Sequence, residues 1–248
     1  MNEKRAPRIN PALLVEGLGH AYGGHPSLDD IGFVVQPGGF TALLGLNGAG
    51  KTTLISCLIR LAGPWRGRVR ICGVDPIVWP ARAMAKIGVV FQEPTLDLDM
   101  TMAQNLGHHA ALHGLSRAFA KARVEADLVS HGLARYADRK VRDLSFGIRR
   151  RAEVARALLH RPSLVMMDEA TAGLDVPSRR ALGNNLRRMC RHDGLAVLWA
   201  THAVDEVHVS HRLVVLHEGR QLATGKVGDV IKRTGRGSLR AAFSALTS

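Results

Sequence analysis

The stretch that decides the fold is Gly45-Leu46-Asn47-Gly48-Ala49-Gly50-Lys51-Thr52-Thr53, which matches the pattern G-x-x-x-x-G-K-[ST] at every fixed position. The apolar run from Phe40 to Leu44 predicts a buried strand before it, and apolar residues at helical spacing from Thr52 to Leu61 predict a helix after it. Backbone N–H groups in such a turn point inward and add to the positive end of the helix dipole. The order strand, glycine-rich turn, helix therefore predicts a cradle for anions.

The residue types of this stretch fit phosphate groups. Glycines let the backbone approach the phosphates closely, Lys51 brings a full charge to the β- and γ-phosphates, and the hydroxyl of Thr52 can ligate Mg²⁺. An ordinary glycine-rich turn is the alternative, but it does not account for a strand, a lysine and a threonine all in place. The sequence therefore predicts a nucleoside triphosphate site. Its cradle would consist of Gly45, Asn47, Gly48, Ala49, Gly50, Lys51, Thr52 and Thr53.

Length and composition limit the class of protein. With 248 residues, 46% of them hydrophobic, the chain can form one large α/β domain or two small ones. The net charge of +13 is scattered, and aromatics make up only 4% of the chain, so nucleic-acid binding is not favoured. The three cysteines are widely spaced, which indicates buried reduced thiols. Because Met1 to Pro7 lacks a signal-peptide core and no apolar run is long enough for a bilayer, we expect a cytosolic chain.

Short apolar strands recur along the chain with helical patterns between them. Strands are predicted at residues 87–91, 164–167, 196–199 and 213–216, whereas residues 101–160 have a mostly helical pattern. This alternation is typical of a largely parallel sheet, and the helical stretch indicates an inserted lobe. Nucleotide sites in such sheets lie at the carboxyl ends of the strands.

The strand at 164–167 ends in a pair of acids, Asp168 and Glu169. Carboxylates are unfavourable in a protein core, so acids at the end of a buried strand need an explanation. One acid could hold Mg²⁺, and the next could polarise the water that attacks the γ-phosphate. A plain acidic loop would be the favoured interpretation in isolation, but downstream of a phosphate loop the functional interpretation is favoured.

Further elements follow in a fixed order: Gln92 at a strand end, Leu144-Ser145-Phe146-Gly147-Ile148, Gly173-Leu174-Asp175, and Ala200-Thr201-His202. With the phosphate loop and the acid pair, this set resembles the nucleotide-binding subunit of ABC transporters over nearly the whole chain. The resemblance implies an α/β fold, a P-loop NTPase (RecA-like) core with an antiparallel β subdomain and an inserted α-helical subdomain. It implies one ABC ATPase domain over 1–248. Within it, 1–93 and 161–225 would form the core with the β subdomain, 94–160 the helical subdomain, and 226–248 a basic C-terminal tail.

The same resemblance implies a role for each matching residue. Tyr22 would stack on adenine, Gln92 would approach Mg²⁺ and the attacking water, and Asp168 would organise Mg²⁺. Glu169 would be the general base, and His202 would contact the γ-phosphate. The resemblance thus implies that catalysis depends on Lys51, Gln92, Glu169 and His202, and that Mg²⁺ is held by Thr52, Gln92 and Asp168. Asp175 would lie at a dimer interface.

The element that starts at Leu144 departs from the family pattern, which is usually L-S-G-G-Q. Ser145 and Gly147, which would contact the γ-phosphate bound to a partner subunit, are present, but Phe146 and Ile148 replace the first glycine and the glutamine. A phenylalanine adds bulk and removes backbone freedom where two subunits would close. Relatives with a residue other than glycine at the third position are known, so the departure does not indicate a dead site. Two interpretations stay open: a tolerated variant of the pattern, or a brake on the turnover rate.

The resemblance also implies partners and a location. Two copies would close head to tail around two ATP molecules, and a separate permease would carry the substrate. The sequence looks most like multidrug- or lipid-type (ABC-2-type) exporter ATPases in the stretch from Phe91 to Asp97, in Asn105-Leu106 and in the predicted helix to Leu115. Such ATPases lie on the inner face of the membrane, where they are bound to their permease.

Two alternatives stay open. One is a soluble ABC ATPase acting on ribosomes or nucleic acid, which a single short domain disfavours. The other is a nucleotide-gated regulatory subunit with little turnover, which Phe146 and Ile148 suggest.

A weaker pattern lies in the helical stretch. His109 and His113 are four residues apart on a predicted helix, a spacing that can bind a metal ion. The sequence shows no evident third ligand. A solvated or packed helix face is therefore the favoured interpretation.

Overall fold

A computed structural model describes residues 10–63 and 65–248, and the stretch from Met1 to Pro7 on which the location was argued lies outside them. The strands of this part are β1 (Leu13–Tyr22), β2 (His25–Val35), β3 (Phe40–Leu44), β4 (Trp65–Ile71), β5 (Ile87–Val90), β6 (Leu164–Asp168), β7 (Ala196–Thr201), β8 (Arg212–His217) and β9 (Arg220–Lys226). The α-helices are α1 (Lys51–Leu58), α2 (Pro80–Met84), α3 (Met102–Leu112), α4 (Arg117–Ser130), α5 (Phe146–Leu158), α6 (Val176–Asp193), α7 (Val227–Arg233) and α8 (Leu239–Thr247), and short 3-10 helices are η1 (Ala134–Tyr136), η2 (Val141–Asp143) and η3 (Val204–Glu206).

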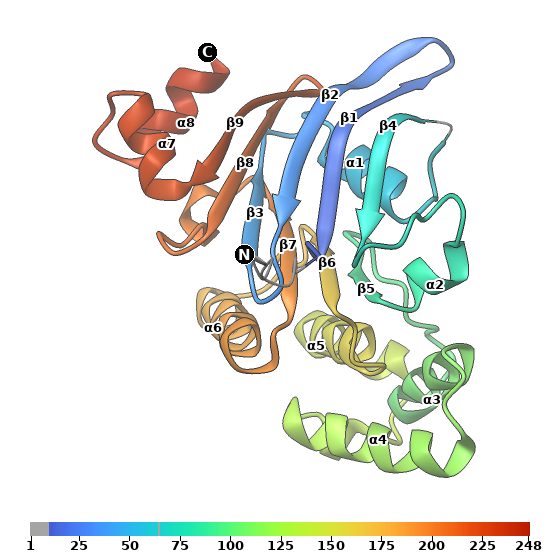
Figure 1. Ribbon diagram of the computed structural model, residues 1–248. Helices are drawn as coiled ribbons and strands as arrows, with labels where there is room; N and C mark the ends of the chain where they lie inside the picture. Colours follow the sequence, from blue (N-terminus) through green and yellow to red (C-terminus); the bar gives the residue numbers. More distant parts are fainter. Residues whose placement is uncertain (1–9, 64) are drawn as a thin grey trace, which may run out of the picture.

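Within the described residues the strands form one sheet in the order β4-β1-β2-β9-β8-β3-β7-β6-β5. One end of it is antiparallel: β1 pairs with β2 on one side and with β4 on the other. The β1–β2 turn is made by Gly23 and Gly24, whose φ angles of +54° and +86° suit the tight turns that match strand twist. The predicted antiparallel β subdomain is confirmed (Figure 1).

The other end of the sheet is the core, in which β8, β3, β7, β6 and β5 run parallel. All residues of β3, β6 and β7 are buried, as expected for parallel strands covered on both faces. Alternate residues point to opposite sides. Leu43 and Met166 pack with α1, whereas Val165 and Trp199 pack with α5 and α6. The sheet is thus a middle layer that fixes the carboxyl end of each parallel strand near the start of α1.

The helical stretch forms a lobe of α3, α4 and part of α5 that lies to one end of the sheet (Figure 1). Helix α3 begins at Thr101 with a capping box, in which Thr101 and Gln104 satisfy each other's backbone N–H groups. Helix α5 belongs to both parts, because one face packs in the lobe and Val154 and Ala157 pack on the sheet. Glycine is required at Gly88 of β5, since a Cβ there would lie 2.0 Å from the carbonyl oxygen of Ala157.

The C-terminal segment corrects one expectation. Residues 226–248, expected to be a basic tail, complete β9 and then form the helices α7 and α8. Val227, Val230 and Phe243 are buried against β3 and β8, while the basic side chains stay exposed. In the sequence, the basic residues of this segment obscured the apolar face that its helices bury. None of the helices in residues 10–63 and 65–248 has the length and hydropathy needed to span a bilayer.

Candidate nucleotide site

The phosphate loop joins β3 to α1 in a backbone shape that favours glycine. Gly48 has a φ of +80°, and Gly50, which precedes α1, has a φ of +99°. Gly45 is needed for space, because a Cβ there would lie 2.7 Å from the carbonyl oxygen of Leu216. Ala49 is buried, and its carbonyl accepts a hydrogen bond of 3.1 Å from the backbone N–H of Gly219. The loop is therefore held from beneath by the turn between β8 and β9.

A pocket of about 620 Å³ opens over the loop. It is lined by Pro26, Ser27, Asn47, Gly48, Gly50, Lys51, Thr52, Thr53, Gln92, Glu169, Glu218 and Gly219. The structure thus brings most of the predicted cradle together with Gln92 and Glu169. The sequence did not indicate Ser27 of β2 or Glu218 of the β8–β9 turn, since neither stretch has a phosphate-binding pattern.

Lys51 is the cation at the floor of this pocket, and its side chain is buried. Its ammonium donates to the carbonyl oxygens of Gly45 at 2.9 Å and Leu46 at 3.0 Å. It also lies 3.2 Å from Oε1 of Glu169. The positive charge is therefore fixed beside the predicted base, with little of it lost to solvent screening.

Glu169 is placed by its backbone. Its φ of +47° is uncommon for a residue with a side chain, and its N–H donates to the carbonyl of Ala200 at 3.0 Å. The carboxylate is 11% exposed and lies between Lys51 and His202, whose Nδ1 donates to Oε2 at 3.1 Å. A carboxylate between a lysine and a half-exposed histidine can hold a water and accept its proton.

Asp168 lies one residue earlier and is buried. Burial raises the pKa of its carboxyl, a hydrogen bond from the Thr52 hydroxyl lowers it, and the nearby charge of Glu169 raises it again. Oδ1 of Asp168 is buried with no hydrogen-bond partner among the residues that the structure describes. A carboxylate oxygen and a hydroxyl are hard oxygen donors of the kind Mg²⁺ prefers. The pair Thr52 and Asp168 therefore fits a magnesium ion.

Arg150 of α5 connects the strand ends, and sequence reasoning missed it. Its side chain is 1% exposed. Its guanidinium donates to the carbonyl oxygens of Phe91 at 2.6 Å, Ala170 at 2.8 Å, Gln92 at 3.1 Å and Glu169 at 3.3 Å. One buried cation thus holds the backbone of two predicted catalytic residues. The signal in the sequence was ambiguous, because Arg150 stands between two other arginines.

Glu206 of η3 is a second such connector. Its carboxylate accepts hydrogen bonds from the hydroxyl of Thr171 at 2.5 Å, the hydroxyl of Thr201 at 2.7 Å and Nε1 of Trp199 at 3.2 Å. These donors lie next to the acid pair and next to His202. Glu206 therefore ties the segment after Glu169 to the segment that carries His202.

Ser145 and Gly147 lie elsewhere. Neither is among the residues that line the phosphate pocket within 10–63 and 65–248. Ser145 is exposed and precedes α5, and its hydroxyl makes no capping hydrogen bond to the described helix. Phe146 covers Gly173, where a Cβ would lie 2.5 Å from its ring. The altered element therefore packs on the Gly173 turn of its own chain.

Tyr22 and Asp175 complete the predicted set. Tyr22 ends β1, is 50% exposed and packs edge-on against His20, with 4.5 Å between ring centroids. It does not line the phosphate pocket as described for residues 10–63 and 65–248. Asp175 caps α6, because its carboxylate accepts from the N–H of Ser178 at 2.7 Å. The structure therefore shows Tyr22 as an aromatic ring at a hairpin tip and Asp175 as a helix cap.

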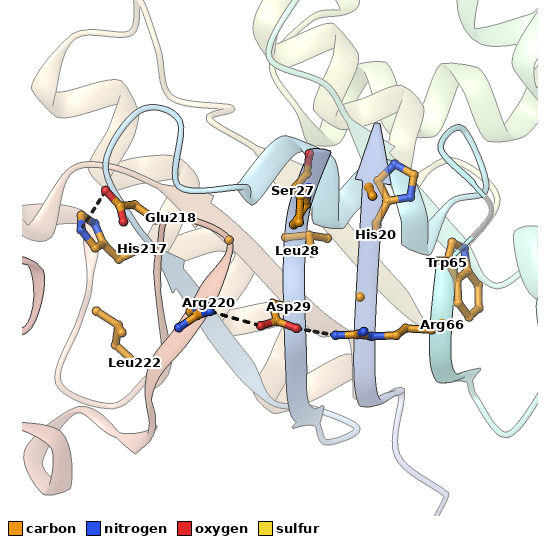
Figure 2. Close-up of a pocket in the computed structure, with 14 residues that line it drawn as sticks. His20, Ser27, Leu28, Asp29, Trp65, Arg66, His217, Glu218, Arg220 and Leu222 are labelled. Atoms are coloured by element: carbon orange, nitrogen blue, oxygen red, sulfur yellow. Dashed lines mark hydrogen bonds and ion pairs between the residues drawn. The ribbon is translucent and has the colours of Figure 1, made fainter. Parts of the chain in front are cut away.

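A second pocket, of about 880 Å³, adjoins the first and shares Pro26, Ser27, Glu218 and Gly219 with it. Figure 2 shows how Asp29 of β2 lies between Arg66 of β4 and Arg220 of β9, forming an ion pair with each. These side chains are exposed, so each pair adds at most about 1 kcal/mol. The two ion pairs connect β4, β2 and β9 across the sheet beside the phosphate pocket.

Comparisons with known proteins agree with this geometry. Residues 28–172 match the family model described as ABC transporter. The Nod factor export ATP-binding protein I of Paraburkholderia xenovorans is 41% identical over 216 residues, which cover 86% of this chain and 70% of that protein. The energy-coupling factor transporter ATP-binding protein EcfA1 of Symbiobacterium thermophilum is 34% identical over 241 residues, covering 92% of this chain and 83% of that protein.

Among solved structures, an ATP binding subunit of an ABC transporter matches with a TM-score of 0.87 and 31% identity, over 96% of this chain and 100% of that one. The sequence matches cover most of the chain, and the structural match covers the sheet and the helical lobe together. The predicted P-loop NTPase fold with its two subdomains is confirmed. The chain belongs to the ABC transporter family, as an ATP-binding subunit with the ATPase domain of that family.

Proposed function

We propose that this chain hydrolyses Mg–ATP to power the export of a substrate through a separate permease. The observation that carries the proposal is the single pocket in which Lys51, Thr52, Gln92 and Glu169 meet. The exporter subclass is supported by the Nod factor export relatives, at 41% and 40% identity.

The proposed roles follow from the contacts. Lys51 would neutralise charge that develops on the β- and γ-phosphates, from its buried place at the floor of the pocket. Thr52, Asp168 and Gln92 would hold Mg²⁺, which supplies further charge neutralisation when bound. Glu169 would orient the attacking water and accept its proton, and His202 would hold the carboxylate of Glu169 in place.

The remaining predicted residues would act at the edges of the site. Ser145 and Gly147 lie outside the pocket of their own chain, and Ser145 is exposed at the start of a long helix. We therefore propose that they complete the pocket of a second copy in a head-to-tail homodimer, as N–H and hydroxyl donors to its γ-phosphate. Tyr22 would stack on adenine, for which its half-exposed ring is available.

The domain division and the location belong to the same proposal. We assign 1–93 with 161–225 to the ATPase core and β subdomain, and 94–160 to the helical subdomain, with α5 shared between them. The chain would work on the inner face of the cell membrane, bound to its permease, with no direct role for nucleic acid.

Phe146 supports a second candidate, a nucleotide-gated regulatory subunit with little turnover, because its ring packs on the Gly173 turn.

The test is purification of the tagged chain from detergent-solubilised membranes of its own host, with and without ATP. The proposal expects an integral membrane protein in stoichiometric amount and Mg–ATP hydrolysis by the complex. Recovery with ribosomes or RNA would instead favour the soluble ABC ATPase. A complex with the membrane protein that binds ATP but does not hydrolyse it would favour the regulatory subunit.

A further inference from the structure

Three histidines of the helical lobe converge, although only two of them are close in sequence. His109 lies in α3, His113 is the residue that caps the C-terminal end of α3, and His160 follows α5. One ring nitrogen from each lies within 4.8 Å of the other two. The rings of His113 and His160 are stacked at 3.7 Å, and those of His109 and His113 are 4.5 Å apart. His160 is the third ligand that the sequence pattern lacked.

The hydrogen bond of His160 defines its tautomer. Its Nε2 lies 2.9 Å from the carbonyl oxygen of Ile87. A carbonyl can only accept, so Nε2 carries the proton and Nδ1 has a free lone pair in the neutral ring. Nδ1 is buried with no hydrogen-bond partner among the described residues. An imidazole that donates one N–H to a backbone carbonyl and offers its other nitrogen is the arrangement usual for metal-binding histidines.

His109 offers a second free nitrogen. Its Nε2 is likewise buried and unpartnered within the described part of the chain. A buried ring nitrogen without a hydrogen-bond partner is unfavourable, and His109 and His160 each have one. A cation between them would satisfy both.

We propose that His109, His113 and His160 form a binding site for a divalent transition-metal ion of the zinc class, separate from the nucleotide pocket. Imidazole nitrogens suit zinc, copper and nickel, whereas Mg²⁺ prefers oxygen donors. Three histidines leave one position for water in a tetrahedral site. The ion would link α3 to the end of α5 and, through Ile87, to the start of β5, where the lobe meets the sheet (Figure 1).

The site has two features that limit its affinity. A tetrahedral ion with Zn–N bonds of about 2.0–2.1 Å needs nitrogens roughly 3.4 Å apart, so the His113 ring must turn out of its stack on His160. His113 is the C-cap residue of α3 and is only partly buried, so its ring is not enclosed on all sides. The positive charge of Arg156, which also lowers the pKa of His109, opposes a second cation nearby. The affinity should therefore be below that of four-ligand structural zinc sites.

The experiment is a titration of untagged, nucleotide-free, chelator-treated full-length chain with ZnCl₂ in the presence of millimolar Mg²⁺. We expect one zinc ion per chain, with affinity lowered at least ~10-fold by His160→Gln and by His113→Gln. His108→Gln is the matched control, because His108 is exposed on the same helix. It should bind zinc within about twofold of the parent, since it supplies no ligand.

Two further readouts exclude loss of folding as the cause. Co²⁺ in place of zinc should give the visible absorption of a tetrahedral site in the parent and in the His108 variant, but not in the His160 variant. Zinc should raise the melting temperature of the parent and leave that of the folded His160 variant unchanged. The proposal is overturned if the parent binds no zinc, or if His160→Gln and His113→Gln bind it as tightly as His108→Gln does.

Discussion

Arg150 and Glu153, one helical turn apart in α5, form a buried ion pair with 2.7 Å between Nη1 and Oε2. Both partners also reach outside the helix. Arg150 binds the carbonyl oxygens of Gln92 and Glu169, and the second carboxylate oxygen of Glu153 accepts from the backbone N–H of Thr95 at 2.6 Å. Helix α5, which packs in both the lobe and the core, thus holds the segment after β5 and the segment after β6 in one network. Such a network is stabilising only while every member is satisfied.

Replacing Arg150 with Met should therefore damage both stability and catalysis. The change leaves the charge of Glu153 buried without a partner, which costs about 3–5 kcal/mol in comparable cases, and frees the backbone of Gln92 and Glu169. Urea unfolding measures the first effect and steady-state ATP turnover the second. Arg151→Met removes the same charge from an exposed neighbour and should stay within about 0.5 kcal/mol of the parent. Equal stability of the two variants would contradict the role of Arg150.

Lys51→Ala should weaken ATP binding at least ~10-fold, about 1.4 kcal/mol. The substitution removes the buried charge that lies 3.2 Å from Glu169 and faces the phosphate pocket. Titration with a fluorescent ATP analogue gives the affinity, and Lys232→Ala on the exposed face of α7 is the charge-matched control. An affinity equal to that of the control would show that this loop does not hold the phosphates.

Glu169→Gln should trap an ATP-bound dimer. Glutamine keeps the size of the side chain but cannot take a proton from water, so hydrolysis should slow ~100-fold or more while Mg–ATP still binds through Thr52 and Asp168. Size-exclusion chromatography with Mg–ATP measures the dimer. Glu218→Gln, which removes an acid from the same pocket, is the control. If the Glu169 variant hydrolyses ATP at the parent rate, another residue is the base.

Asp168→Asn should stabilise the magnesium-free protein at neutral pH, by roughly 0.5–2 kcal/mol. Burial raises the pKa of Asp168, so the folded state binds this proton more tightly than the unfolded state does. Stability from this group is therefore full below the ordinary aspartate pKa and is lost as pH rises through the raised value. Urea unfolding of both proteins from pH 4 to pH 8 tests this direction. The free energy of unfolding of the variant should exceed that of the parent at neutral pH, and the difference should shrink on acidification. Its magnesium-dependent hydrolysis should be lost.

Phe146→Ala should raise ATP turnover several-fold without tighter ATP binding to the isolated subunit. The ring covers Gly173, whose φ is +74°, and its removal frees this turn beside Glu169. Phe119→Ala truncates another exposed phenylalanine, on α4, and should leave turnover unchanged. The variant leaves Ile148 unchanged, because Ile148 packs on the apolar core of the lobe. Replacing it with the glutamine of the family pattern would lower the stability of the lobe. A fall in turnover would mean that Phe146 packs productively between two subunits.

The nucleotide pocket could be predicted in part because its main elements are contiguous. The loop from Gly45 to Thr53 carries its own conformational requirements, and the pair Asp168 and Glu169 stands out because acids rarely end a buried strand. Parallel strands then bring their carboxyl ends to one edge of the sheet. Local chemistry and a general rule of topology were therefore enough to place Lys51 near Glu169.

The sequence by itself determined the phosphate loop, the alternation of strands and helices in the core, and the family, since each depends on residues adjacent in the chain. Only the tertiary structure decided that Arg150 holds the backbone of Gln92, that Phe146 covers Gly173, and that His160 joins His109 and His113. In each case the partners come from different helices or loops. Side chains that meet across helix faces and loops are selected by packing and burial, which no periodicity in one segment specifies.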